Sequence, residues 1–293
     1  MRSGRLVDRA TQAWVRVTGR RVELEQHPWL VGPYGLPDRI GDEWVAREAA
    51  RLGGTARDDD AGLMASMSDL DGPGFTAADL APQVRDFYER TSRWRLEVWS
   101  QWGALAWPFG WLISVVFARR LEQLSLPLRP LDVAQGMDSR VVRVDDADGR
   151  RLGAAWLRTL RSTGQQVYSG WYGTATLPGA DRPSVRVVFP LPNGSVSVFL
   201  RPEVDIDGSL RLVSVNGRFG QDGAYLLVRE PDGRTAAVRR VPLLERFRVY
   251  VDDKSVLRTD HDLRLWRIPV IRLHYRLEAP RTSTSPARES DVT

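Results

Sequence analysis

The second half of the chain alternates short apolar runs with turn residues, and this pattern predicts an antiparallel sheet. Between Ser184 and Arg229, runs rich in Val, Leu and Phe are separated by Asn-Gly or Asp-Gly pairs. Such pairs tolerate the positive φ angles of the type I′ turns that join paired strands. Pairs of this kind begin at Asp148, Asn193, Asp207, Asn216, Asp222 and Asp232. Their spacing predicts about eight to ten strands between residues 139 and 278.

Alternation along the predicted strands indicates which residues share a face. The last strand shows it most clearly, with Ile271, Leu273, Tyr275 and Leu277 on one face and Arg272, His274 and Arg276 on the other. Gly170 and Gly173 interrupt another strand, where glycine permits a bend or the close approach of a neighbouring group. No helical period intervenes, so residues 139–278 are expected to form an antiparallel β barrel or sandwich.

Helical spacing instead dominates residues 1–126, which we expect to form a helical, aromatic-rich region. Over residues 5–18, one apolar stripe is formed by Leu6, Ala10, Trp14 and Val17. A second helix is expected after Asp38, with an apolar face of Ile40, Trp44, Val45, Ala49 and Leu52. Residues 76–126 are also expected to be helical, because Trp94, Val98, Trp102 and Leu105 follow one another at helical intervals.

The remaining segments divide the chain. Residues 53–75 combine Gly, Ser and Asp, and they predict a mobile connection within the helical region. Residues 127–138 contain Pro and Gly and predict a linker. Residues 279–293 have few apolar side chains, and we expect a disordered tail. The fold class is therefore α+β.

One stretch is unusually apolar. Residues 102–118 carry no charge and include three tryptophans, and Arg119 and Arg120 follow them. A membrane-spanning helix needs about 20 predominantly apolar residues, and this stretch is shorter and contains Pro108. The alternatives for residues 102–118 are a buried pair of helices, an element at a membrane surface and a membrane-spanning helix.

Composition narrows the classes of partner. The chain has 293 residues and a net charge of +5, but its 42 basic residues are dispersed among 37 acidic ones. Nucleic-acid binding usually requires clustered basic residues, so we expect no nucleic-acid partner. The chain contains no cysteine, which excludes disulfides and thiolate metal sites. The first residues lack the apolar core of a secretory signal, and a cytoplasmic location is expected.

Candidate catalytic residues are few. The phosphate-binding loop, the nucleophile elbow and the zinc-binding His-Glu-x-x-His motif are absent from the sequence, and no cofactor or metal is predicted. His261 and His274 lie on two predicted strands that could form a hairpin. Asp260 or Glu245 could then complete an acid–base or metal site with them.

A ligand cavity is the other candidate site. Large amphipathic rings occur on most predicted strands, and small barrels that hold a ligand combine apolar walls with a few polar anchors. The candidate ligand-binding residues are Tyr168, Trp171, Tyr172, Arg201, Tyr225, Tyr250 and Trp266. Aromatic residues on strands also serve as ordinary core.

The segment Ser169–Gly173, which reads Ser-Gly-Trp-Tyr-Gly, resembles the Gly/Trp start of lipocalin-type (calycin) ligand-binding barrels. The resemblance covers five residues, lacks the full Gly-x-Trp spacing and transfers no functional residue to this chain. It implies a calycin-like barrel.

The sequence therefore leaves three alternative functions. The first is binding of an apolar, lipid-like small molecule in a β-barrel cavity that the helical region caps. The second is an enzyme that acts in that cavity through His261, His274 and Asp260. The third is a membrane-associated scaffold that contacts the bilayer through residues 102–118 and through the amphipathic residues 5–18.

Overall fold

The computed structural model describes residues 2–35, 42–59, 61–102, 137–161, 164, 166–266 and 268–279. The α-helices are α1 (Arg2–Thr18), α2 (Glu43–Arg51) and α3 (Pro82–Glu89), and short 3₁₀ helices span Pro28–Leu30, Met67–Leu70, Ala77–Asp79 and Thr91–Arg93. The strands are β1 (Arg20–Glu23), β2 (Thr55–Arg57), β3 (Arg95–Trp102), β4 (Met137–Asp145), β5 (Arg151–Leu160), β6 (Gln166–Ala175), β7 (Ser184–Leu191), β8 (Gly194–Val204), β9 (Leu210–Val213), β10 (Gly223–Arg229), β11 (Thr235–Val241), β12 (Leu243–Val251), β13 (Leu257–Leu265) and β14 (Ile268–Glu278).

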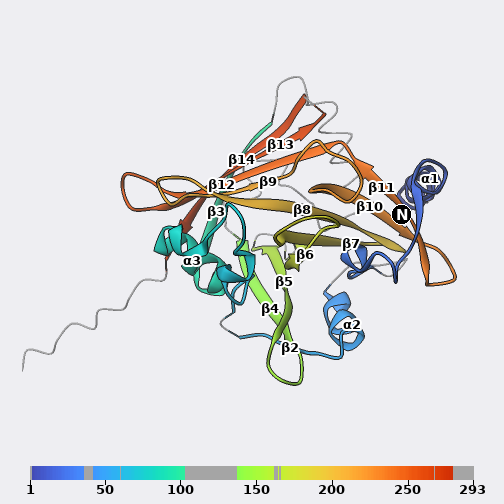
Figure 1. Cartoon of the computed structure of the whole chain (residues 1–293), viewed down its shortest axis with the longest axis horizontal. Helices are drawn as coiled ribbons and strands as arrows, with labels where there is room; N and C mark the ends of the chain where they lie inside the picture. The colour runs from blue at the N-terminus through green and yellow to red at the C-terminus, as the bar shows by residue number, and fades with distance from the viewer. Residues whose placement is uncertain are drawn as a thin grey trace, which may run out of the picture.

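These strands form a large antiparallel sheet (Figure 1), which confirms the prediction for the second half of the chain. The main order is β2-β4-β5-β6-β7-β8-β9-β12-β13-β14-β3. The first half of the chain also contributes strands, because β1 pairs with β11, β2 with β4 and β3 with β14. The two halves therefore share one sheet.

The sheet forks at β8. Residues 194–199 of β8 pair with β10, whereas residues 201–204 pair with β9. The branch continues from β10 to β11 and β1. The chain between β9 and β10 thus passes from one branch to the other, so Asn216-Gly217 lies in a crossing loop and does not form the expected hairpin turn.

The sheet curls so that its two ends face each other. The guanidinium carbon of Arg158 on β5 lies 5.6 Å from the ring centroid of Tyr275 on β14, although many strands separate β5 from β14 along the sheet. β3 and β4 also lie close together. Among the described residues no ladder joins β3 to β4, so the sheet is not closed into a barrel.

The main core fills part of the inner side of this curl, which we call the concave face. Alternate residues of the strands meet the segment 61–94 there, and Met67, Leu70 and Phe75 are fully or almost fully buried. The sequence predicts a mobile connection over residues 53–75. The structure instead places Met67, Leu70 and Phe75 of this segment in the core. Their apolar positions follow no helical or strand period, since short 3₁₀ turns carry them.

Two layers cover the opposite, outer face of the sheet. Helix α2 packs Trp44, Val45 and Ala49 onto β4–β7, beside Trp171 and Val188. The segment 24–32 covers β8, β10 and β11 through Trp29 and Leu30. Figure 1 shows α2 below the sheet and α1 at its edge beside β10 and β11.

The helical expectation for residues 76–126 is correct only for α3 within the described residues. Residues 95–102 form β3, and Leu96, Val98 and Trp102 pair with the alternating residues of β14. A spacing of four residues fits one face of a strand as well as one face of a helix, which explains the difference. Residues 103–118 of the apolar stretch, residues 127–136 of the expected linker and residues 280–293 of the expected tail lie outside the described residues.

Candidate functional site

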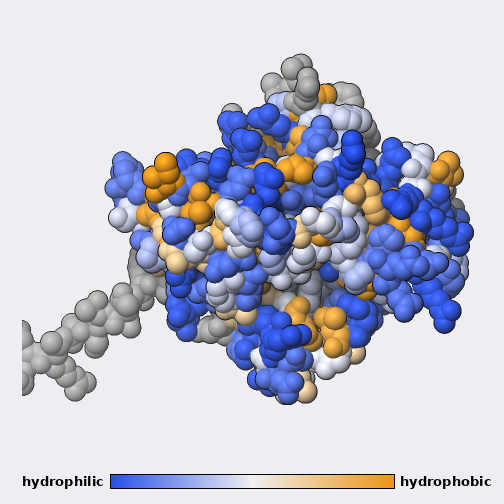
Figure 2. Space-filling view, viewed as in Figure 1, coloured by the Kyte–Doolittle hydropathy of each residue, from blue (hydrophilic) through white to orange (hydrophobic). Residues whose placement is uncertain are grey.

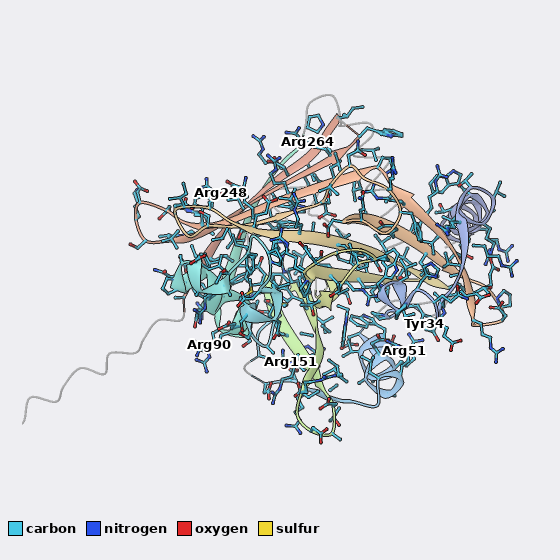
Figure 3. The ribbon with its side chains drawn as sticks, in the orientation of Figure 1. Tyr34, Arg51, Arg90, Arg151, Arg248 and Arg264 are labelled. Carbon is cyan, nitrogen blue, oxygen red and sulfur yellow. The ribbon has the colours of Figure 1, made fainter. Side chains whose placement is uncertain are left out.

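The candidate ligand-binding residues are divided between the two faces of the sheet. Tyr168 and Tyr172 of β6 face the concave side and pack against its core. Trp171 and Tyr225 belong to the outer clusters. By strand alternation Arg201 and Tyr250 also point outward, since Leu200 and Val249 occupy the concave core. Tyr250 lies beside Arg248, on the side of the molecule opposite Arg51 and Arg151 (Figure 3).

Trp266 is in the turn between β13 and β14 and is 63% exposed. The structure therefore brings together only Tyr168 and Tyr172 of the seven candidates. The others do not share a cavity with them, because residues at odd and even positions of a strand point to opposite faces.

The two candidate histidines are separated in the same way. His261 faces the concave side, where its Nε2 lies 3.1 Å from Glu245 Oε2 and its ring stacks on Phe247 at 3.7 Å between centroids. His274 faces outward and pairs with Asp260 at 2.6 Å. Two His–carboxylate pairs on opposite faces replace the single site expected from sequence. Within the described ranges, no cluster of three metal-binding side chains is formed.

A set of polar and aromatic side chains converges on the concave face, and we call it the concave cluster. Its members come from both walls of the curl and are Trp156 and Arg158 of β5, Tyr168 and Tyr172 of β6, Glu245 of β12, His261 of β13 and Tyr275 of β14. Strands that are far apart along the chain therefore position one group of side chains.

Arg158 is the centre of the concave cluster. Its guanidinium carbon lies 3.7 Å from the Trp156 ring centroid and 5.0 Å from that of Tyr168. The residue is only 8% exposed and its side chain hydrogen-bonds that of Tyr275, while its Nε has no hydrogen-bond partner within the described residues. Arg151 on the same strand pairs with Asp145 at 3.1 Å, but among the described residues no carboxylate forms an ion pair with Arg158. Aromatic rings surround this buried cation, and the Glu245 carboxylate of the same cluster pairs with His261 instead.

The tyrosine hydroxyls of the concave cluster form a second feature. Tyr168 and Tyr172 are joined by a hydrogen bond of 2.6 Å between their hydroxyl oxygens. Gly170 lies between them, and a Cβ at this position would be 3.1 Å from the Tyr168 hydroxyl and 3.3 Å from a ring carbon of Phe189. Of the two roles predicted for this glycine, a bend or a close approach, the distances fit the close approach.

Burial controls the protonation of these tyrosines. It raises the pKa of Tyr172 to about 12, and the neighbouring Glu245 carboxylate adds to this effect. Burial and then Tyr172 raise the pKa of Tyr168 well above its usual value. Burial also raises the pKa of Tyr275, against the opposing effect of Arg158. All three hydroxyls consequently remain protonated and able to donate hydrogen bonds at neutral pH.

Two partly buried apolar rings contact the concave cluster, since Phe189 meets Tyr168 edge to face at 5.5 Å between ring centroids and Phe247 stacks on His261. Phe189 and Leu191 of β7, Val241 of β11, and Leu243 and Phe247 of β12 pack against the core but stay partly accessible. A buried cation, several hydroxyl groups and partly accessible apolar side chains therefore lie on the same concave face.

Sequence reasoning did not identify Trp156, Arg158 or Tyr275 as site residues. One signal was present, because Ala154, Trp156 and Arg158 have the same parity and place one charge on an otherwise apolar strand face. The proximity of Arg158 to Tyr275 had no such signal, since it depends on the curl of the sheet.

The chain is 29% identical over 246 residues to the uncharacterized membrane protein YndJ of Bacillus subtilis (strain 168). The alignment covers 81% of this chain and 41% of that protein, so the chain spans less than half the length of this relative. No family model matches the chain, and no solved structure matches it. None of the helices in the described ranges has the length and hydropathy of a transmembrane span.

Proposed function

We propose that the concave face binds an apolar, lipid-like small molecule. The curled sheet would form the wall of the site, which the sequence pattern predicts to be a closed barrel. The helical segment 61–94 would close one part of the site. The observation that supports this most directly is the concave cluster beside apolar side chains that remain partly accessible.

The chemistry of the lining fits such a ligand. Aromatic rings provide large contact areas at a small loss of conformational entropy, and a few polar groups orient the bound molecule. Phe189, Leu191 and Leu243 supply apolar surface, while Arg158 and the tyrosine hydroxyls supply polar contacts.

The experiment compares two adjacent leucines on opposite faces. Leu243 packs against the concave core, and Leu244 follows it on β12 with the opposite orientation. The uncharged dye Nile red should bind the unmodified protein with enhanced fluorescence. Leu243→Trp should weaken this binding by about tenfold or more, because the larger ring occupies the site. A tenfold loss of affinity corresponds to about 1.4 kcal/mol of binding free energy.

Leu244→Trp is the matched control and should leave the affinity within about twofold, a change below 0.5 kcal/mol. An absence of dye binding, or equal effects of the two substitutions, would contradict the proposal. Native mass spectrometry of the purified protein supplies a second measurement, with a co-purified apolar molecule as the expected result.

A second candidate function is contact with an anionic membrane surface through α1. The described residues of the predicted stripe, Ala10, Trp14 and Val17, are exposed. Trp14 is 44% exposed and Val17 is 83% exposed, while the docked side carries Val15, which is fully buried. Figure 2 shows apolar surface at the position of α1 in Figure 1.

The charges near this stripe suit anionic lipids. Arg9, Arg20 and Arg21 are exposed, and Arg239 lies 5.2 Å from the ring centroid of Trp14. An amphipathic helix with a basic border binds at the interface of anionic bilayers. The name of the Bacillus relative, which describes a membrane protein, agrees with this proposal.

Sedimentation with vesicles tests the membrane proposal. The protein should sediment with vesicles that contain phosphatidylglycerol, less with pure phosphatidylcholine, and less as the salt concentration rises. The double substitution Trp14→Ser and Val17→Ser should reduce the apparent affinity about tenfold or more. Ile206→Ser, in the turn between β8 and β9, removes an exposed apolar side chain elsewhere and should have no effect. Equal sedimentation of the double variant and the unmodified protein would overturn the proposal.

A further inference from the structure

We infer that the ligand of the concave face is an amphipathic acid, with a single ionised oxyanion group bound by Arg158. This inference rests on the proposed binding function and specifies the chemical class of the ligand. Its basis is the buried guanidinium of Arg158, which has aromatic neighbours and no carboxylate partner among the described residues.

A buried cation is stabilised mainly by an opposite charge. Transfer of an ionised group from water into a protein interior is unfavourable unless the group is paired or hydrogen-bonded. Arg186 is buried to a similar degree on the outer face, but its Nη2 donates a hydrogen bond of 2.6 Å to the carbonyl oxygen of Val31. Arg186 thereby holds the segment 24–32 on the sheet. Arg158 hydrogen-bonds the side chain of Tyr275, which is a neutral partner, and no carboxylate among the described residues neutralises its charge. An anion from outside the chain therefore fits its environment.

The neighbours of Arg158 orient it for an oxyanion. Trp156 stacks on the guanidinium at 3.7 Å and covers one of its faces, so the N–H groups point outward from the guanidinium edge. The hydrogen bond to Tyr275 uses part of this edge, and a guanidinium has five N–H groups. A guanidinium edge matches the two oxygens of a carboxylate through parallel hydrogen bonds. The Tyr168–Tyr172 hydrogen bond uses one hydroxyl proton, which leaves the second hydroxyl free to donate to the same anion.

Glu245 limits the charge of the ligand. Its carboxylate lies in the same cluster, where it is paired with His261 at 3.1 Å and raises the pKa of Tyr172. A second negative group on the ligand would be repelled by Glu245. A molecule with one acidic head and an apolar body is therefore favoured over a dianion.

Competition against bound Nile red tests this inference with two probes of equal chain length. Oleate and oleyl alcohol differ in the head group, so their displacement constants report the contribution of the charge. Oleate should displace the dye about 10- to 100-fold more strongly than the alcohol, as expected for a charge-assisted hydrogen bond. Arg158→Met should remove this preference and leave displacement by the alcohol within about threefold.

Two further variants complete the design. Arg158→Lys keeps the charge but not the planar fork, and it should retain part of the preference for oleate. Arg186→Met removes the equally buried arginine of the outer face and should leave the preference unchanged. If Arg158→Met does not fold, the comparison of the two probes on the unmodified protein still tests the acidic head group, and Arg158→Lys tests the role of the arginine.

The possible failures are distinguishable. If the protein does not bind Nile red, the proposed binding function fails. If it binds the dye but oleate and oleyl alcohol displace it equally, or neither displaces it, the binding function stands and the acidic ligand is excluded. A preference for oleate that survives Arg158→Met also overturns the role of this arginine.

Discussion

Replacement of Trp44 by alanine is expected to lower the free energy of unfolding by about 3–5 kcal/mol, the range for large aromatic residues removed from a core. Trp44 is 2% exposed and donates a hydrogen bond of 2.8 Å to Ser169 Oγ. Its ring meets Trp171 edge to face at 6.4 Å. Alanine would leave a cavity and an unpaired hydroxyl between α2 and the sheet.

The length of α2 makes this loss severe. The helix has nine residues, and isolated helices shorter than about 12–15 residues are marginal in water. Docking of its apolar face onto β4–β7 therefore provides most of its stability. Loss of Trp44 should release α2 as well as remove buried area.

Urea denaturation followed by circular dichroism measures this change. Trp266→Ala is the control, because this tryptophan is 63% exposed and its removal should alter the free energy of unfolding by about 0.5 kcal/mol or less. Similar values for the two variants would show that α2 does not cover the sheet through Trp44.

Gly194→Ala should destabilise the protein by about 3 kcal/mol, at the upper end of the usual loss from overpacking. A Cβ at position 194 would lie 1.9 Å from the carbonyl oxygen of Leu227 on β10. The obstacle is backbone in a paired strand and cannot move by a change of rotamer. The β8–β10 ladder, which forms one branch of the fork, would have to separate.

Gly173→Ala is the matched control in another strand. The nearest atom to a Cβ at position 173 is 3.7 Å away, which is ordinary van der Waals contact. Alanine there should be tolerated or slightly stabilising, since glycine in a strand interior costs about 0.5–1 kcal/mol relative to alanine. Thermal unfolding of both variants gives the comparison, and an unaffected Gly194→Ala variant would contradict the observed fork.

Gly194 also shows how a correct turn prediction can have the wrong register. The Asn193-Gly194 pair predicts a turn centred on both residues, and a hairpin does form between β7 and β8. Leu191 pairs with Gly194, however, so the loop consists of Pro192 and Asn193, and Asn193 carries the positive φ of 58°. Gly194 is the first residue of β8 and is required by the proximity of Leu227.

Local chemistry was sufficient at three other turns. Gly149, Gly208 and Gly233 adopt positive φ angles of 79°, 77° and 67° in the turns that follow β4, β8 and β10. The alternation of the last strand is also confirmed, with Leu273 and Leu277 buried and Arg272 exposed. These features depend on interactions between residues that are close in sequence, so the sequence is enough to predict them.

The sequence by itself determined that the second half of the chain forms antiparallel strands and which residues share a strand face. It could not determine that residues 95–102 join the sheet, because a spacing of four fits a helix and a strand equally well. Alternation also assigns side chains to opposite faces without indicating which face becomes concave. That choice, the fork at β8 and the meeting of Arg158 with Tyr275 follow from pairings between distant strands, and only the tertiary structure decided them.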